Sequence, residues 1–142
     1  MRRILLVKSR SMECSAIKTL ISNLFSDAAL EEIDCEQASG YLPSNPSPDL
    51  IVYAPRSVGR LGKRFQLLKM LAGRAKILVY STFQQDEQYL FDYLAAGVNG
   101  ILSKSAHVNE HQRALDTVMR GDSYVDAGTR GIMLKSMRAV LV

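Results

Sequence analysis

Charged and hydroxyl side chains follow the short apolar runs of this sequence, at the positions where buried strands would end. The residues at these run ends are Lys8, Ser9, Ala54, Ser81 and Lys104. Two ammonium groups and a hydroxyl group that converge at one edge of a sheet could hold a small anion or a partner's carboxylate. The alternative is that Lys8 points to solvent and Lys104 bonds a backbone carbonyl group.

The same run ends lack carboxylates, and this limits the chemistry that they can perform. Mg²⁺ needs carboxylate oxygens, and the ammonium group of Lys8 would repel it. Ser81, Lys104 and Lys8 make a poor nucleophile set, because no base and no orienting acid accompany them. No glycine-rich phosphate-binding loop that ends in lysine and serine is present either. The sequence therefore predicts a protein that is not an enzyme, holds no metal or cofactor, and acts through contacts.

The elements that must position these residues alternate between strand and helix. Short continuous apolar runs predict buried strands, expected at Ile4–Val7, Leu30–Cys35, Leu50–Tyr53, Ile77–Tyr80 and Ile101–Leu102. Periodic apolar residues predict helices, expected at Ser11–Phe25, Lys63–Ala72, Asp86–Ala95, Val108–Arg120 and Ala127–Leu141. This alternation predicts a parallel sheet covered on both faces, with its functional site at the carboxyl ends of the strands.

Three local features add detail to this pattern. Ser9 or Ser11 could cap the start of the first helix with its hydroxyl group. Leu30–Cys35 is more polar than the other strands, which places it at an edge of the sheet. The segment Ala38–Pro48 contains three prolines and a glycine, which argue against a regular helix there.

Composition indicates one soluble domain. The chain has 142 residues, of which 47% are hydrophobic and 23% are charged, as in ordinary globular proteins. No apolar run approaches the roughly 18 residues that a membrane span needs. Met1–Val7 is too short for a signal-peptide core and is interpreted as a first strand, so a cytoplasmic location is expected. Cys14 and Cys35 are expected to be reduced and buried.

Basic residues are concentrated in the middle of the chain. No acidic residue lies between Asp49 and Asp86, whereas seven cations do: Arg56, Arg60, Lys63, Arg64, Lys69, Arg74 and Lys76. This basic patch could dock nucleic acid or an acidic protein, and the alternative is a solvated helix face. Stacking on single strands is not expected, because Phe65 is the only aromatic residue between Arg56 and Lys76.

The order and spacing of three motifs resemble the receiver domain of two-component response regulators. The motifs are PDLIV at 48–52, ILVYS at 77–81 and AAGVNGILSK at 95–104. The resemblance covers Met1 to Asp126, nearly the whole chain. The segment 114–126 is similar to the end of receivers from the LuxR/NarL-type transcription regulators, as is Ser105, where many other receivers have a proline.

The resemblance implies an α/β doubly wound, five-stranded parallel sheet of order 2-1-3-4-5, the CheY-like or flavodoxin-like topology. A shortened second helix and an extra C-terminal helix are expected. In the family, two acids after strand one and one acid at the end of strand three bind Mg²⁺, and the strand-three acid is phosphorylated. A hydroxyl group and a lysine contact the phosphoryl oxygens, and an aromatic residue on strand five repacks.

Only part of that set is kept here. Ser81 matches the hydroxyl position and Lys104 the lysine. Lys8 and Ser9 stand where the two acids after strand one should be. Ala54 replaces the phosphorylated residue, and Ile101 replaces the switch aromatic. The chain thus resembles a degenerate receiver, or pseudo-receiver, whose alanine cannot accept a phosphoryl group.

Two functions follow as hypotheses. In the first, residues 1–126 are a phosphorylation-independent regulatory domain of a LuxR-type regulator, and residues 127–142 are a helix or linker to an additional DNA-binding domain. A homodimer is expected, because the last helix has more apolar surface than water tolerates. In the second, the chain is a stand-alone adaptor or antagonist that binds a partner protein. His107 and His111 are expected to be surface or packing residues, and a flavodoxin-like cofactor binder is the rival on fold grounds.

Overall fold

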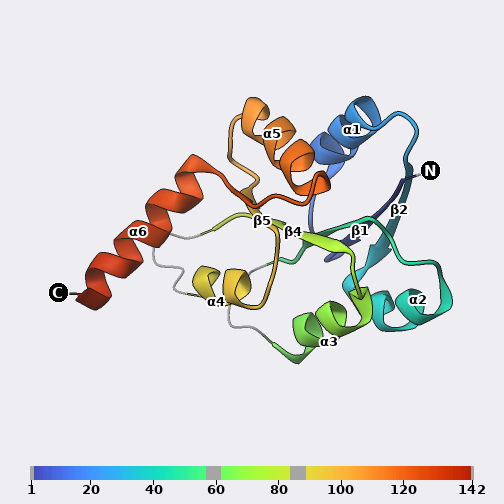
Figure 1. Cartoon of the computed structure of the whole chain (residues 1–142), viewed down its shortest axis with the longest axis horizontal. Helices are drawn as coiled ribbons and strands as arrows, with labels where there is room; N and C mark the ends of the chain where they lie inside the picture. The colour runs from blue at the N-terminus through green and yellow to red at the C-terminus, as the bar shows by residue number, and fades with distance from the viewer. Residues whose placement is uncertain (1, 57–61, 84–88, 142) are drawn as a thin grey trace.

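The computed structural model describes residues 2–56, 62–83 and 89–141, with side chains described as far as residue 137. In this part of the chain, six parallel strands form one sheet in the order β2-β1-β3-β4-β5-β6 (Figure 1). The strands are β1 Arg3–Lys8, β2 Ala29–Asp34, β3 Leu50–Ala54, β4 Lys76–Ser81, β5 Gly100–Ser103 and β6 Tyr124–Val125. The helices are α1 Ser15–Leu24, α2 Ala38–Ser44, α3 Lys63–Ala72, α4 Leu90–Ala95, α5 Val108–Met119 and α6 Ala127–Leu141, and a short 3-10 turn, η1, covers Cys35–Gln37.

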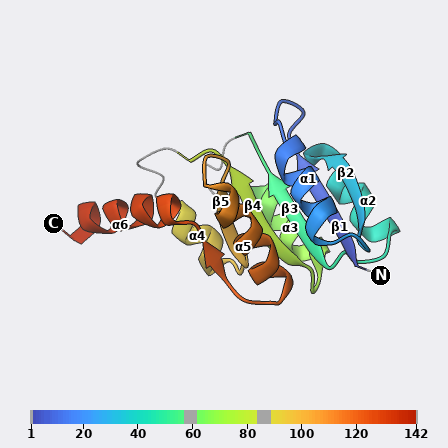
Figure 2. The same cartoon turned by 90° about the horizontal axis from the view of Figure 1, so that it is seen from above.

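Helices cover both faces of the sheet. α1 and α5 lie on one face, and α2, α3 and α4 lie on the other (Figures 1 and 2). Alternate residues of β1 face opposite cores, because successive side chains of a strand point to opposite faces. Leu5 and Val7 pack into the core under α2, α3 and α4, whereas Ile4 and Leu6 pack under α1 and α5. Burial of each such side chain stabilises the fold by roughly 1.5–3 kcal/mol.

The last helix, α6, leaves the body of the protein. It begins two residues after β6 and extends away from the sheet toward the C-terminus (Figure 2). Its inner face packs on the domain through Thr129, which is fully buried, and Met133, which is 6% exposed. Further along the helix, Leu134 and Met137 are exposed. No helix in the described ranges is both long and apolar enough to cross a membrane.

The expected strand order is confirmed for the first five strands, and the expected number of strands is wrong by one. Tyr124 and Val125 form β6, which pairs in parallel with Gly100 and Ile101 of β5. The chain reaches this position after Gly121, whose φ of 94° is in the left-handed region that favours glycine. A two-residue strand is too short to leave a periodic pattern in the sequence, so only the tertiary contact reveals it.

The expectation that prolines prevent a helix after β2 is wrong, although the shortened second helix is present. α2 has seven residues and includes Pro43. Pro43 removes one backbone donor near the end of a helix that has few internal bonds to lose. Ala38 and Leu42 are buried and hold α2 on the sheet. Upstream, η1 is supported by a capping box, in which the Gln37 side chain accepts the Asp34 N–H at 2.9 Å.

The first helix starts later than expected and is not capped by either candidate serine. α1 begins at Ser15, and Cys14 at its N-cap makes no side-chain capping bond. The Ser11 hydroxyl instead accepts a hydrogen bond from Arg56 Nε at 2.9 Å. The N-terminal turn is satisfied by Glu13, whose carboxylate accepts the Ser15 N–H at 2.6 Å. The predicted start of the fourth helix at residue 86 lies outside the described residues.

Candidate functional site: a pocket at the carboxyl edge of the sheet

The run-end residues predicted from the sequence come together at the carboxyl edge of the sheet. Lys8 pairs with Ala54 across β1 and β3, and Ser81 pairs with Ser103 across β4 and β5. Because these four strands are parallel neighbours, their last residues form one row. Ala54 and Ser81 are both 0% exposed. Ala54, at the end of β3 in the middle of this row, therefore carries a methyl group and no carboxylate.

Lys8 is held by partners within the protein. Its Nζ donates to the backbone oxygen of Met12 at 3.0 Å and lies 3.3 Å from the carboxylate of Glu32 on β2. Glu32 also contacts Lys18 Nζ at 2.6 Å. The hydrogen bond from Lys18, together with the one from Lys8, holds the pKa of Glu32 below its usual range. Lys8 thus bonds a carbonyl group and a carboxylate. Its side chain is 19% exposed, so the expectation that Lys8 could point to solvent is wrong.

Lys104 binds the same loop from the other side. Its Nζ donates to the backbone oxygen of Glu13, and its backbone N–H donates to Ser81 O at 2.9 Å. The carbonyl groups of Met12 and Glu13 are consecutive in the chain. Lys8 and Lys104 therefore hold neighbouring carbonyl groups of the β1–α1 loop, which we call the lysine clamp. The expected alternative for Lys104, a bond to a backbone carbonyl group, is what the structure has.

The remaining polar groups of the pocket are also bonded internally. Ser81 Oγ donates to Pro55 O at 3.0 Å. Ser9 N–H donates to Ala54 O at 3.0 Å, and its hydroxyl oxygen accepts the Arg56 N–H at 3.2 Å. An anion between Lys8 and Lys104 would therefore have to displace bonds that already exist. Among the described residues, no group of three His, Cys, Asp or Glu side chains is placed to hold a metal ion.

Ile101 occupies the position where the resemblance places a switch aromatic. It is 0% exposed, and it pairs with Val79 on β4 and Val125 on β6. Its side chain belongs to the core under α2, α3 and α4. Aliphatic packing on both sides leaves this side chain inside the core, where it cannot report the state of the pocket by moving to the surface.

Three cations of the expected basic patch lie near the carboxyl edge of the sheet, and they differ in their contacts. Arg56 is bonded to Ser11 and Ser9 of the β1–α1 loop. Lys63 and Arg64 are exposed in the first turn of α3. Arg60 lies outside the described residues.

The other three cations lie toward the opposite edge of the sheet. Lys69 is half-buried in the last turn of α3, beside Gly97. Arg74 is exposed in the turn that follows α3, and Lys76 is the first residue of β4. Because α3 runs back along the sheet over roughly 15 Å, it separates these cations from Lys63 and Arg64. The structure therefore does not bring the six described cations together in one continuous patch.

A buried carboxylate that the sequence did not single out joins the pocket strand to α6. Asp126 is 1% exposed. Its Oδ1 accepts the Ser103 N–H at 2.9 Å and the Thr129 hydroxyl at 2.6 Å, and its Oδ2 accepts the Thr129 N–H at 3.1 Å. Asp126 is therefore the N-cap of α6, and its side chain also bonds the backbone at the end of β5. An aspartate directly before the first residue of the predicted helix was the available signal, since Asp is a preferred N-cap residue.

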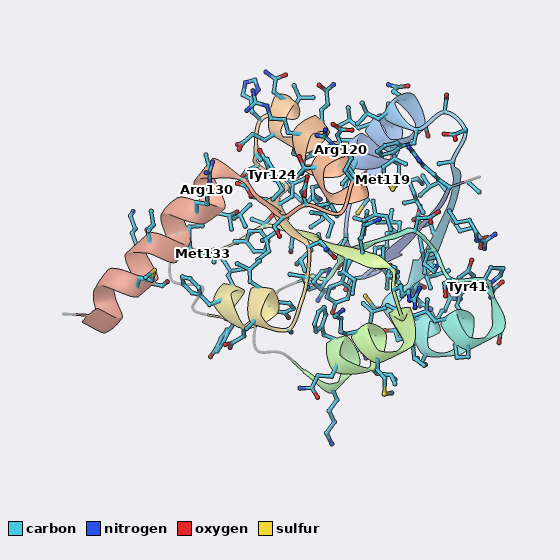
Figure 3. All side chains as sticks on the ribbon, viewed as in Figure 1. Tyr41, Met119, Arg120, Tyr124, Arg130 and Met133 are labelled. Atoms are coloured by element: carbon cyan, nitrogen blue, oxygen red, sulfur yellow. The ribbon has the colours of Figure 1, made fainter. Side chains whose placement is uncertain are left out.

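A second carboxylate holds the same junction from α5. Glu110 Oε1 accepts the Ala127 N–H at 2.9 Å and the Tyr124 hydroxyl at 3.0 Å. The bond from Ala127, with that from Tyr124, lowers the pKa of Glu110. Figure 3 shows Tyr124 between α5 and the start of α6, with Arg130 and Met133 further along α6. The start of α6 is thus fixed to both β5 and α5.

His111 is a buried packing residue. It is 5% exposed, and its ring lies edge-on to that of Tyr80 with centroids 5.4 Å apart. Nδ1 lies 3.1 Å from the backbone oxygen of His107, an acceptor, so Nδ1 carries the proton. Nε2 is then the acceptor for the Tyr80 hydroxyl at 2.9 Å. This pair supports the expectation that His111 is a packing residue, whereas His107 is exposed.

Solved structures with the same fold are found among response regulators. A LuxR family DNA-binding response regulator from Silicibacter pomeroyi has a TM-score of 0.71 at 19% identity, over 90% of this chain and 98% of that one. A LuxR family two-component response regulator from Aurantimonas has a TM-score of 0.74 at 18% identity, over 95% and 96%. The isolated receiver domain of RcsB from Salmonella enterica has a TM-score of 0.71 at 13% identity, over 93% and 98%.

The chain has the fold of a response-regulator receiver domain. At these identities the likeness shows the fold, so function has to be argued from the site. No protein-family model matches the sequence, and the comparison with curated proteins gives no match. Lys8, Ala54, Ser81 and Lys104 meet because they stand at or directly after the ends of four neighbouring parallel strands of this fold.

Proposed function

We propose that this receiver fold is a phosphorylation-independent regulatory domain of a LuxR-type response regulator. It acts in the cytoplasm, in signal transduction and transcription regulation, through contacts with a second copy or another protein, and it is not an enzyme. The observation that carries the proposal is Ala54 at the end of β3, buried and paired with Lys8. A methyl group cannot form an acyl-phosphate, and a lysine beside it supplies a positive charge where Mg²⁺ would have to bind.

The lysine clamp supports a fixed pocket. In a switching receiver, a bound phosphoryl group would supply negative charge for the pocket lysine. Here Lys104 and Lys8 bond the carbonyl groups of Glu13 and Met12, and Glu32 supplies the negative charge. Each charged group then has a partner without any ligand, and hydrogen bonds to charged groups contribute roughly 1.5–3 kcal/mol each. The pocket is therefore expected to stay in one arrangement.

Dimerisation is supported by an apolar groove between α4 and α6, with a volume of about 490 Å³. Phe91 lies on one wall and Leu134 and Met137 on the other, and all three side chains are between 37% and 54% exposed. Apolar side chains grouped in this way on a helix are typical of protein interfaces. We propose that a second copy of the chain covers this groove. DNA would then be bound only through an additional C-terminal domain, which α6 would position.

Sedimentation of matched variants tests the dimer and its face. We expect Leu134→Glu to shift the protein from dimer to monomer, because a carboxylate would be buried in the apolar interface without a partner. Leu24 is 40% exposed on α1, on the other face of the sheet. Leu24→Glu should leave the dimer intact. A dimer broken by the α1 variant and kept by the α6 variant would move the interface to α1, and a wild-type monomer at all concentrations would contradict the dimer.

The phosphorylation test is a mass measurement. After incubation with an acyl-phosphate donor and Mg²⁺, we expect no stoichiometric gain of one phosphoryl group, because no carboxylate stands at position 54. An intact receiver treated in parallel serves as the positive control. A stoichiometric, Mg²⁺-dependent adduct would defeat the proposal.

The second candidate is a stand-alone adaptor or antagonist that binds an intact regulator. The same exposed α4–α6 groove supports it, since a partner regulator could cover the groove in place of a second copy. The mass of the endogenous protein separates the two candidates. A mass larger than this chain by a DNA-binding domain supports the transcription regulator, and a mass equal to this chain supports the adaptor.

A further inference from the structure

A second pocket, separate from the degenerate phosphorylation pocket, opens at the carboxyl ends of β1 and β3. Its volume is about 310 Å³, at the lower end of the range for small-molecule sites. The walls come from β1, β3, η1 and the first turns of α2 and α3. The lining residues are Val7, Cys35, Glu36, Ala38, Ser39, Tyr53, Lys63, Arg64, Leu67 and Leu68. None of them belongs to the set Lys8, Ser9, Ala54, Ser81 and Lys104.

The topology makes this position a natural crevice. β1 lies between β2 and β3 in the sheet, so the chain leaves β1 toward one side and later crosses to the other. In open α/β sheets, ligands bind outside the carboxyl ends of the strands at this change of direction. Val7 near the end of β1 and Tyr53 near the end of β3 form the floor. We call the cavity the switch-point pocket.

Tyr53 points to a ligand in this pocket. Its side chain is 7% exposed and packs on Phe65 with ring centroids 5.6 Å apart, yet its hydroxyl makes no hydrogen bond to any residue in the described ranges. Burial raises the pKa of this hydroxyl, and Cys35 and Arg64 are close enough to affect it, so it is a neutral donor at physiological pH. Tyr53 lines the pocket, so a ligand there could accept a hydrogen bond from this hydroxyl.

The mouth of the pocket is positively charged. Lys63 and Arg64 form the first turn of α3, where no acidic residue is present. Neither forms an ion pair with a described residue. Two cations at the positive end of a helix dipole are unfavourable neighbours, and an anion bound there would relieve both the dipole and the cations. Glu36 is the acidic residue in the lining and is exposed, so the formal charge of the lining stays positive.

We propose that the switch-point pocket binds a small phosphate monoester. The phosphate group would lie on Lys63, Arg64 and the first N–H groups of α3. The organic part would lie on the apolar surface of Val7, Leu67 and Leu68 and would accept a hydrogen bond from Tyr53. Binding would join the first residues of α2 and α3 across the switch-point pocket. The inference does not depend on dimerisation or on the absence of phosphorylation, so it can fail or hold independently of the proposed function.

The test is an NMR titration of the whole chain with phenyl phosphate and, separately, with inorganic phosphate. We expect saturable shifts of the Tyr53, Arg64 and Phe65 amide resonances, and tighter binding of the monoester than of the inorganic ion. Arg64→Gln should weaken binding at least tenfold, whereas Arg74→Gln, an exposed cation outside the pocket, should leave it unchanged. Tyr53→Phe should weaken binding severalfold without loss of stability, since the hydroxyl has no partner among the described residues.

Three results would overturn the proposal. The first is that no resonance shifts saturably with either probe. The second is that the shifts centre on Lys8 and Lys104, which would place the anion in the degenerate pocket. The third is equal affinity for the monoester and inorganic phosphate in all variants, which would mean that the apolar floor and Tyr53 take no part.

Discussion

Replacement of Asp126 by alanine is expected to destabilise the protein by about 3 kcal/mol or more. The carboxylate is 1% exposed and accepts three hydrogen bonds, from the Ser103 N–H and from both donors of Thr129. Loss of a helix N-cap costs about 0.5–2 kcal/mol, and each buried donor left without a partner adds about 1–3 kcal/mol. Urea unfolding of Asp126→Ala beside the wild type measures the loss.

The same substitution should loosen α6 before it unfolds the domain, because Asp126 is the bond between α6 and β5. Hydrogen exchange of the α6 amides is expected to become faster than in the wild type, whereas the exchange of the β1 and β3 amides should remain the slowest in the protein. Asp122→Ala, at an exposed position of the same segment, is the control and should change stability by less than about 0.5 kcal/mol. A stability loss below about 1 kcal/mol for Asp126→Ala, with unchanged α6 exchange, would show that α6 is held by its apolar face alone.

The consequence for function is that α6 is coupled to the end of β5, beside the pocket. Ser103 N–H is bonded to Asp126, and the next residue, Lys104, forms one half of the lysine clamp. The direction in which α6 leaves the domain is therefore fixed by the same strand end that a switching receiver would move. In a regulator with an additional DNA-binding domain, this connection would set how that domain is presented.

Alkaline pH should remove a large part of the stability between about pH 10 and pH 12. Burial raises the pKa of Tyr80 to about 12, and burial also raises the pKa of Tyr53. Below pH 10 both tyrosines are neutral in the folded and in the unfolded chain. Above pH 10 the unfolded chain loses these protons first, so stability falls as pH rises toward the folded pKa. Tyr80 alone contributes about 2–3 kcal/mol of this fall.

Two tyrosine variants separate the charge effect from the hydrogen bond. Tyr53→Phe removes an ionisable group with no hydrogen bond to a described residue, so we expect wild-type stability at pH 7 and a shallower loss toward pH 12. Tyr80→Phe removes the donor to His111 Nε2, which should cost about 1–3 kcal/mol at pH 7. Unfolding free energies from urea titrations at pH 7, 10 and 11.5 measure both effects. If the free energy of unfolding fell by the same amount between pH 10 and pH 11.5 in all three proteins, the buried tyrosines could not be the cause.

The absence of a carboxylate at position 54 was determined by sequence, because the side chain itself is decisive. No neighbouring group can give Ala54 a carboxylate, whatever the tertiary structure. Four runs such as Leu50–Tyr53 are apolar on both faces, and they predicted a covered parallel sheet. The order β2-β1-β3-β4-β5 was expected from the resemblance to receiver domains. The more polar β2 was expected at an edge of the sheet, and it lies there.

The state of the pocket was decided by tertiary structure. Lys104 bonds Glu13, which lies 91 positions earlier in the chain, and Asp126 bonds Ser103 over 23 positions. Hydrogen bonds of this kind depend on which strand ends and loops meet in space, and no local spacing encodes them. The two-residue β6 and the proline-containing α2 were missed for a related reason: the bonds from β5 and the burial of Ala38 and Leu42 outweigh weak local preferences. The sequence thus determined that position 54 carries no carboxylate, and the fold decided that Lys8 and Lys104 hold a loop.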